Sequence, residues 1–150
     1  MIDSNLATWA LRLLRFAISA TFIYAGVIKA LSPIRFTSDI HNYRLLPWSM
    51  AVALSFYLPW LEIASGFALL LRPFYRAAAA ILAVLTIIFI VASASARIRG
   101  IDISCGCFGH LSDKLSFGWH LGLNTVLLLL LLALWRSTHL RQTAQTKEAI

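Results

Sequence analysis

The stretch AAAAILAVLTIIFIVASASA, residues 77–96, carries no charged side chain. A bilayer core about 30 Å thick requires about 20 residues of α-helix, so this stretch is long and apolar enough to cross it. Three further segments have a similar length and character, namely residues 11–31, 50–71 and 115–135. The sequence therefore predicts an all-α, integral membrane four-helix bundle, built as a single domain over residues 1–150.

The composition excludes most classes of soluble protein. Hydrophobic residues make up 60% of the 150 residues and charged residues only 13%, whereas soluble domains carry roughly 25% charged residues. The 13 basic and 6 acidic side chains give a formal net charge of +7, but no loop concentrates them as a nucleic-acid surface would. We therefore expect membrane lipid, and not nucleic acid, around this chain.

A short helix is predicted between the first two spans. Ser32 followed by Pro33 is typical of a helix start. Apolar residues then alternate with charged ones along residues 33–46. This pattern predicts a short helix at the membrane interface.

The number of spans sets the sidedness of the loops. Four spans place both termini on one side and the loop of residues 97–114 on the other. Basic residues divide almost evenly between the two sides, so the positive-inside rule favours cytoplasmic termini by a narrow margin. We interpret residues 11–31 as a span and not as a cleaved signal peptide, because no small-x-small cleavage site follows a short apolar core.

The loop between the third and fourth predicted spans contains Cys105-Gly106-Cys107. The glycine permits the sharp backbone bend that a disulfide between such close residues needs. Strain raises the reduction potential of a disulfide and makes the pair a labile electron acceptor. We therefore predict that Cys105 and Cys107 are redox-active, with burial as small inert side chains as an alternative.

Metal binding is a second alternative for this loop. His110 follows Cys107 by three positions, and Asp102 precedes the pair, so Cys105, Cys107 and His110 form a candidate ligand set. A structural zinc site needs four firm ligands, whereas soft copper(I) accepts two thiolates. A copper or zinc handling protein therefore competes with a redox protein.

An ionisable residue is predicted inside the second span. A span that began at Pro59 would be too short, so Glu62 lies within the membrane. Such a residue is costly there and is usually paired or functional, and Lys29 is the partner that the sequence offers. We expect Glu62 to act in proton transfer or cysteine activation, with a structural ion pair as the alternative.

A pocket for a substrate or an electron acceptor is predicted near the cysteine loop. His120 and Asn124 are one helical turn apart and share one face of the fourth span. Interface anchoring and interhelical hydrogen bonding are their alternative roles. Lys29, Tyr57 and Trp60 complete the candidate set.

Four motifs carry a family resemblance: YAGVIK (24–29), YRLLP (43–47), LPWLE (58–62) and CGCFG (105–109). Together they resemble the MauE branch of the DoxX-like membrane proteins. The resemblance implies a bacterial inner-membrane protein with four helices, a periplasmic cysteine loop and cytoplasmic termini. MauE is associated with production of the disulfide-rich small subunit of methylamine dehydrogenase, alongside a periplasmic thioredoxin-like partner.

The expected activity is thiol–disulfide exchange between the Cys105/Cys107 pair and a periplasmic thioredoxin-like partner or disulfide-containing client. Arg97, Arg99 and Lys114 would favour the thiolate. Membrane disulfide-forming enzymes with four helices use quinones, and by that analogy a quinone is the acceptor, although this chain lacks their additional cysteine pairs. A non-catalytic assembly partner is the remaining alternative.

Overall fold

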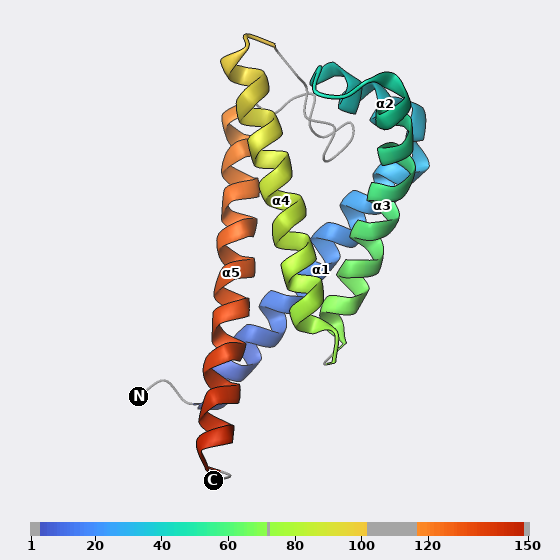
Figure 1. The fold of residues 1–150 in the computed structure, drawn as a ribbon. Coiled ribbons are helices and arrows are strands. Elements are labelled where there is room, and N and C mark those ends of the chain that lie inside the picture. Colours follow the sequence, from blue (N-terminus) through green and yellow to red (C-terminus); the bar gives the residue numbers. More distant parts are fainter. Residues whose placement is uncertain (1–3, 72, 102–116, 149–150) are drawn as a thin grey trace.

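The computed structural model describes residues 4–71, 73–101 and 117–148, and every regular element in these ranges is an α-helix (Figure 1). The predicted all-α class is therefore confirmed for the part of the chain that is described. The helices, in chain order, are α1 (Ser4–Leu31), α2 (Pro33–Asn42), α3 (Trp48–Leu70), α4 (Tyr75–Ile98) and α5 (Phe117–Glu148).

In the part of the chain that the structure describes, three helices are long and apolar enough to cross a membrane. These candidate spans are Trp9–Leu31 in α1, Trp48–Leu70 in α3 and Tyr75–Ile98 in α4. The apolar part of α5 among the described residues is the shorter Leu121–Arg136. The expectation of a membrane protein is therefore supported, while a fourth span over residues 115–135 stays a prediction because residues 115 and 116 lie outside the described ranges.

The ends of α2 and α5 differ clearly from those predicted. The interfacial helix ends at Asn42 and not at residue 46, since Arg44 has a left-handed φ of 51° and a residue before proline, here Leu46, disfavours helix. Helix α5 continues beyond the predicted end at residue 135 as far as Glu148. Its final part is polar and gives no apolar signal, but it contains neither glycine nor proline to end the helix.

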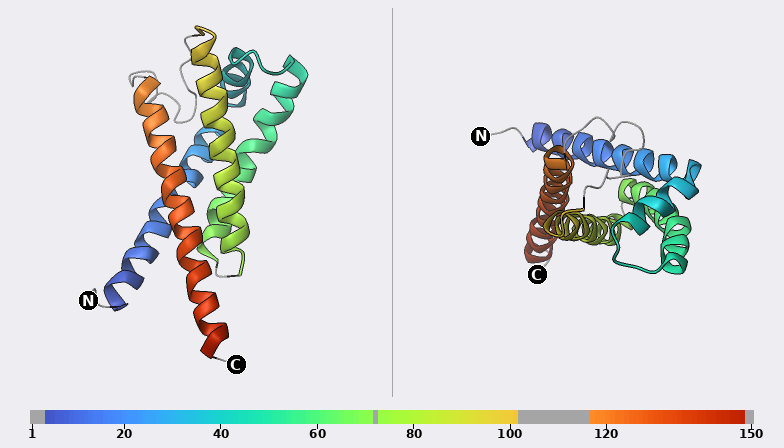
Figure 2. Two further views of the ribbon diagram at one scale, coloured as in Figure 1. Left: turned by 60° about the vertical axis from the view of Figure 1, so that its left-hand side comes forward. Right: turned by 90° about the horizontal axis from the view of Figure 1, so that it is seen from above.

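The long helices alternate in direction. The beginning of α1, the α3–α4 turn and the end of α5 lie at one end of the molecule, whereas α2, the end of α4 and the beginning of α5 lie at the other (Figures 1 and 2). At that second end, α4 stops because Gly100 adopts a φ of 68°, with Ile101 N–H donating to Ala96 O and Gly100 N–H to Arg97 O. The segment that carries the cysteines therefore leaves and re-enters the described structure at the α2 end.

Helices α1, α3, α4 and α5 share a hydrophobic core toward the end of the molecule where α1 begins and α5 ends. Its fully buried members include Ile18 from α1, Leu69 from α3, Leu82 from α4 and Leu131 from α5. Helix α1 packs chiefly on α3, and α4 packs chiefly on α5. Contacts between α3 and α4 join the two helix pairs.

Arg15 connects α1 with the other long helices. Its Nη2 donates hydrogen bonds to Leu69 O at 2.7 Å and Leu70 O at 3.2 Å, carbonyls in the last turn of α3 that lack partners further along the helix. Its guanidinium also lies 4.5 Å from the centre of the Tyr75 ring. The Tyr75 hydroxyl in turn donates to Leu134 O at 2.7 Å, so one arginine on α1 is connected to α3, α4 and α5.

Candidate functional site

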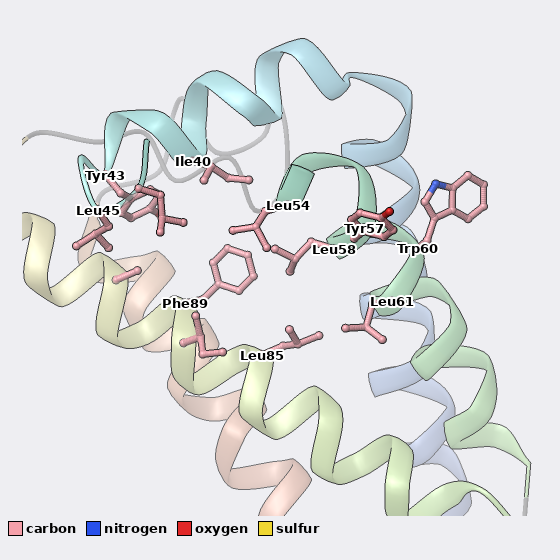
Figure 3. A pocket seen from close by; sticks show the side chains of 13 residues that line it. Ile40, Tyr43, Leu45, Leu54, Tyr57, Leu58, Trp60, Leu61, Leu85 and Phe89 are labelled. Carbon is pink, nitrogen blue, oxygen red and sulfur yellow. The ribbon is translucent and has the colours of Figure 1, made fainter. Parts of the chain in front are cut away.

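An apolar cleft of about 710 Å³ lies between α2, α3 and α4 (Figure 3). Helix α2 is held against α3 by Thr37, whose hydroxyl donates to Ser55 Oγ at 2.6 Å. None of the described residues that line the cleft carries a charged side chain. Its walls are formed by Ile40, Tyr43, Leu45, Leu46, Leu54, Tyr57, Leu58, Trp60, Leu61, Leu85, Ile88, Phe89 and Ala92.

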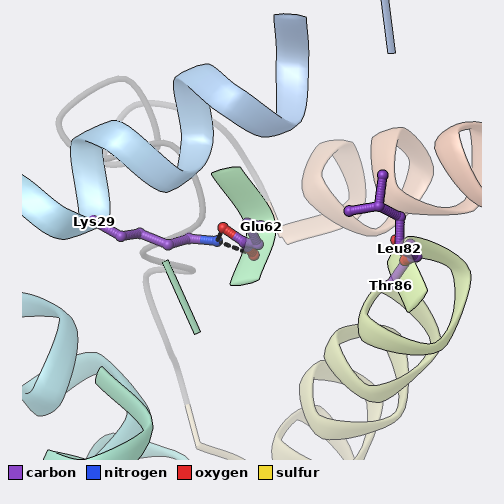
Figure 4. A network of polar contacts seen from close by, with 4 residues as sticks. All are labelled: Lys29, Glu62, Leu82 and Thr86. Carbon is purple, nitrogen blue, oxygen red and sulfur yellow. Dashed lines mark hydrogen bonds and ion pairs between the residues drawn. The ribbon is translucent and has the colours of Figure 1, made fainter. Parts of the chain in front are cut away.

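A buried ion pair joins α1 to α3 behind this cleft. Lys29 Nζ donates to Glu62 Oε1 at 2.7 Å and to Oε2 at 2.8 Å (Figure 4). The two side chains are only 3% and 2% exposed. The prediction that Lys29 is the partner of Glu62 is therefore confirmed, and both carboxylate oxygens are satisfied by one ammonium group.

Two glycines bring α1 and α3 close enough for this pair. A Cβ added at Gly26 would lie 2.7 Å from Ile63 Cγ1 and 2.8 Å from Pro59 O. A Cβ at Gly66 would lie 2.7 Å from Ile23 Cγ1. Small residues commonly allow such close approach between membrane helices. The YAGVIK motif thus places a glycine and the buried lysine about one turn apart on the same helix face.

Two aromatic rings and a small cavity adjoin the ammonium group of Lys29. Lys29 Nζ lies 4.8 Å from the centre of the Phe89 ring and 5.4 Å from that of Phe36, distances typical of cation–π contact. A cavity of about 30 Å³ adjoins the ion pair and is also bordered by Thr86 and Asn124. Its lining is largely apolar, but a space of this size bordered by several polar side chains can hold a water molecule.

The family model described as methylamine utilisation protein MauE matches residues 7–137. The chain belongs to the MauE family. The matched range contains Lys29 and Glu62, together with Cys105 and Cys107. No curated protein and no solved structure gives a significant match to the chain.

In this MauE-family protein, the predicted pocket residues are divided between two cavities. Lys29 and Asn124 border the small cavity beside Glu62, whereas Tyr57 and Trp60 line the apolar cleft. The division follows from helix geometry, because positions 60 and 62 are separated by about 200° around α3. Glu62 therefore faces α1, whereas Trp60 faces away from α1. Phe89 borders both cavities and separates them.

Several predicted residues of the MauE site lie outside what the structure describes. Cys105, Cys107 and His110 belong to the segment 102–116, and Lys114 does too. The backbone of His120 lies in α5, but its side chain is outside the described part. Their roles remain predictions, including the alternative metal set, and the described residues contain no group of three or more His, Cys, Asp or Glu that could hold a metal ion.

Arg99, directly after the end of α4, binds backbone carbonyls of the connection between α2 and α3. Its Nη2 donates to Tyr43 O at 2.7 Å, and its Nη1 lies 3.4 Å from Arg44 O. The guanidinium therefore holds the α2–α3 connection against the end of α4, which braces one wall of the cleft. An effect of Arg99 on a thiolate stays a prediction, because Cys105 and Cys107 lie outside the described residues.

Sequence reasoning missed the aromatic surroundings of the MauE ion pair. Phe36 and Phe89 lie in apolar segments where phenylalanine is ordinary, so neither carries a signal of its own. Thr86 was also missed, although it is the one hydroxyl in the middle of an aliphatic run. Gly26 was visible only as part of the YAGVIK motif, with no indication that it faces Pro59 and Ile63.

Proposed function

We propose that this MauE-family protein is a membrane thiol–disulfide oxidoreductase. The Cys105/Cys107 pair exchanges electrons with a periplasmic thioredoxin-like partner or a disulfide-containing client during maturation of an enzyme of methylamine utilisation. The observation that carries the proposal is the match to MauE over residues 7–137, because it spans the candidate membrane helices together with the cysteine motif. The resemblance to the wider DoxX-like group belongs to the same proposal.

The proposed setting is the bacterial inner membrane, with residues 1–150 forming one membrane domain of four spans. A core that α1, α3, α4 and α5 share supports a single domain. The cysteine loop faces the periplasm and both termini face the cytoplasm. That the loop and the termini lie on opposite sides is supported by the end of α4 and the beginning of α5, which lie at the opposite end of the molecule from the beginning of α1 and the end of α5 (Figure 1).

The bonds and electrons of this exchange balance with only the two cysteines and one partner protein. A thiolate of the pair attacks a disulfide of the partner, forming one sulfur–sulfur bond and releasing one partner thiolate. The second cysteine then attacks the mixed disulfide, so the pair becomes oxidised and the partner gains two electrons. The reverse sequence oxidises a client and reduces the pair.

Glu62 has a proposed role in moving protons for this exchange. The carboxylate is almost fully buried, hydrogen-bonded by Lys29 and next to a cavity that can hold water. Ionisable residues at such depth commonly mark proton pathways. Thr86 and Asn124 border the same cavity and offer hydrogen-bonding groups for that water.

Thiol trapping of Cys105 and Cys107 in growing cells, combined with metal analysis of the purified protein, tests the proposal. A redox protein gives a pair that changes between oxidised and reduced forms when the partner is deleted. A copper or zinc handling protein retains metal on reduced thiols. A non-catalytic assembly partner supports methylamine utilisation even when both cysteines are replaced, and that outcome would overturn the exchange mechanism.

A further inference from the structure

The apolar cleft between α2, α3 and α4 opens to the outside of the protein at membrane depth. Two of its lining side chains, Tyr57 and Trp60, are 77% and 64% exposed, and both lie within the candidate span of α3. In a bilayer this opening faces hydrocarbon. Because close-packed molecules leave few voids larger than a water molecule, a space of about 710 Å³ here is filled by hydrocarbon. The aliphatic and aromatic walls suit an acyl chain (Figure 3).

One end of the cleft reaches the depth at which lipid headgroups lie. Tyr43 and Leu45 form this end, where α4 approaches the connection between α2 and α3 (Figure 3). The candidate span of α3 begins at Trp48, and that of α4 ends at Ile98, so this connection lies just outside the apolar spans. Trp48 is 53% exposed, and tryptophan is enriched where hydrocarbon meets headgroups.

Basic side chains outnumber acidic ones at this end of the cleft. Residues 33–46 and 97–101 contain four arginines and one aspartate. Two of these arginines, Arg44 and Arg99, are exposed and adjacent, because Arg99 Nη2 donates to Tyr43 O at 2.7 Å and Arg99 Nη1 to Arg44 O at 3.4 Å. Within the described part of the chain, neither arginine has a carboxylate at ion-pair distance. Their positive charges therefore favour an anion from outside the chain.

Arg99 continues the face of α4 that lines the cleft. It follows the lining residue Ala92 by seven positions, which is about two helical turns. Arg97 precedes Arg99 by two positions, so it lies about 200° away around the same helix. Arg99 is therefore aligned with the cleft, whereas Arg97 is not.

Arg44 occupies a backbone position that would suit glycine better. Its φ is 51°, a conformation that glycine adopts freely and other residues rarely adopt. Its N–H donates to His41 O at 2.9 Å and ends α2, a role in which glycine is common. Backbone strain of this kind clusters at functional sites. An arginine here is expected if its side chain is needed at the mouth of the cleft.

We propose that the cleft holds one anionic phospholipid, with an acyl chain between α3 and α4 and its phosphate at Arg44 and Arg99. The acyl chain alone gives no preference, because lipid tails are as apolar as the leucines of the cleft. Guanidinium groups form charge-assisted hydrogen bonds with phosphate oxygens. The preference therefore comes from the net charge of the headgroup, and phosphatidylglycerol binds more tightly than zwitterionic phosphatidylcholine. The bound lipid links α4 to the α2–α3 connection, and its binding requires no thiol exchange.

Native mass spectrometry tests this inference with the full-length protein in detergent, titrated with phosphatidylglycerol or phosphatidylcholine that carry the same acyl chains. We expect phosphatidylglycerol to be retained roughly fivefold more tightly, with a smaller difference at high salt. Equal retention of the two lipids would overturn the inference. Inorganic phosphate has the charge without the chain, so it should not displace the lipid, and displacement would contradict a role for the cleft.

Substitutions of arginine test the headgroup site. Arg44→Gln should weaken retention of phosphatidylglycerol roughly fivefold and leave phosphatidylcholine unchanged, whereas Arg44→Lys keeps the charge and should retain most of the binding. Arg97→Gln is the matched control, because Arg97 is an exposed arginine at the same end of α4 on another face. Equal losses in Arg44→Gln and Arg97→Gln would show that only the overall surface charge matters and would overturn the site.

Substitutions of alanine test the seat of the acyl chain. Ala92→Phe fills part of the cleft and should weaken retention of phosphatidylglycerol several-fold. Ala80→Phe is the control, because Ala80 is an exposed residue of the same helix outside the cleft lining, and it should bind like the unaltered protein. Unchanged retention by Ala92→Phe would overturn the placement of the chain. Arg44→Gln alters only an exposed side chain, so the inference remains testable if Ala92→Phe fails to fold.

Discussion

Lys29 Nζ bridges both carboxylate oxygens of Glu62, at 2.7 and 2.8 Å, where neither side chain is more than 3% exposed. The two residues come from helices that touch through glycine, so the pair is enclosed on the α1–α3 side as well as by the rings of Phe36 and Phe89. A buried charge left without its partner costs about 3–5 kcal/mol. Each residue of the pair therefore depends on the other for its place in the membrane.

Replacement of one member of this pair should destabilise the protein more than replacement of both. Glu62→Gln leaves a buried ammonium ion, and we expect a loss of about 3 kcal/mol in the free energy of unfolding. Lys29→Met together with Glu62→Gln removes both charges and should recover most of that loss. Thermal unfolding in detergent measures both variants.

The same double variant separates a structural role of Glu62 from a role in proton transfer. If Glu62 moves protons, the stable double variant should still fail to cycle the cysteine pair in cells, as read by thiol trapping. Normal cycling in this variant would assign Glu62 to structure alone.

Replacement of the glycines in the α1–α3 contact by alanine should destabilise the protein by different amounts. Gly26→Ala meets Pro59 O at 2.8 Å, a backbone atom that cannot easily move, whereas the one atom within 3.0 Å of Gly66→Ala is Cγ1 of the Ile23 side chain. We expect a loss of about 1–3 kcal/mol for Gly26→Ala and a smaller loss for Gly66→Ala. Gly122→Ala, where the added Cβ has nothing within 4 Å, is the control and should be neutral or slightly stabilising. The opposite order in thermal unfolding would contradict the close contact.

Arg15 should contribute to stability where the neighbouring Arg12 does not. Arg15→Leu removes the hydrogen bonds to Leu69 O and Leu70 O and the contact with Tyr75, and charged hydrogen bonds of this kind contribute about 1.5–3 kcal/mol. Arg12 is exposed and lies over Trp9 of its own helix. Equal melting temperatures for Arg15→Leu and Arg12→Leu would show that the Arg15 contacts add little.

The apolar spans were predictable because hydrophobic length alone sets them, as in residues 77–96, which lie wholly inside α4. The Lys29–Glu62 pair was also predictable, since a charge in a span needs a partner and the motifs offered one. The two separate cavities were not predictable, because they depend on which face of α3 meets α1. That choice is made by Gly26 and Gly66, whose packing partners lie on another helix.

The sidedness of the membrane is checked by labelling with an impermeant thiol reagent. In spheroplasts, after mild reduction, Cys105 or Cys107 should react from outside. The control is Phe74→Cys in a Cys105→Ser/Cys107→Ser background, because Phe74 is exposed in the α3–α4 turn at the opposite end of the molecule. This control should react only after lysis, and the reverse pattern would invert the orientation.

The central claim is that two cysteines act in sequence, one attacking a partner and the other resolving the mixed disulfide. We expect Cys105 to attack, so Cys107→Ser should accumulate a reducible adduct with a periplasmic thioredoxin-like protein, and Cys105→Ser should not. If only Cys105→Ser captures the partner, then Cys107 is the attacking residue and Cys105 the resolving one, and the mechanism is unchanged. The most direct measurement is therefore non-reducing electrophoresis of both single variants, with mass spectrometry of any adduct. An adduct in one variant is the predicted result, whereas no adduct in either, with copper bound by the unaltered protein and lost from both variants, would contradict thiol exchange and favour metal handling.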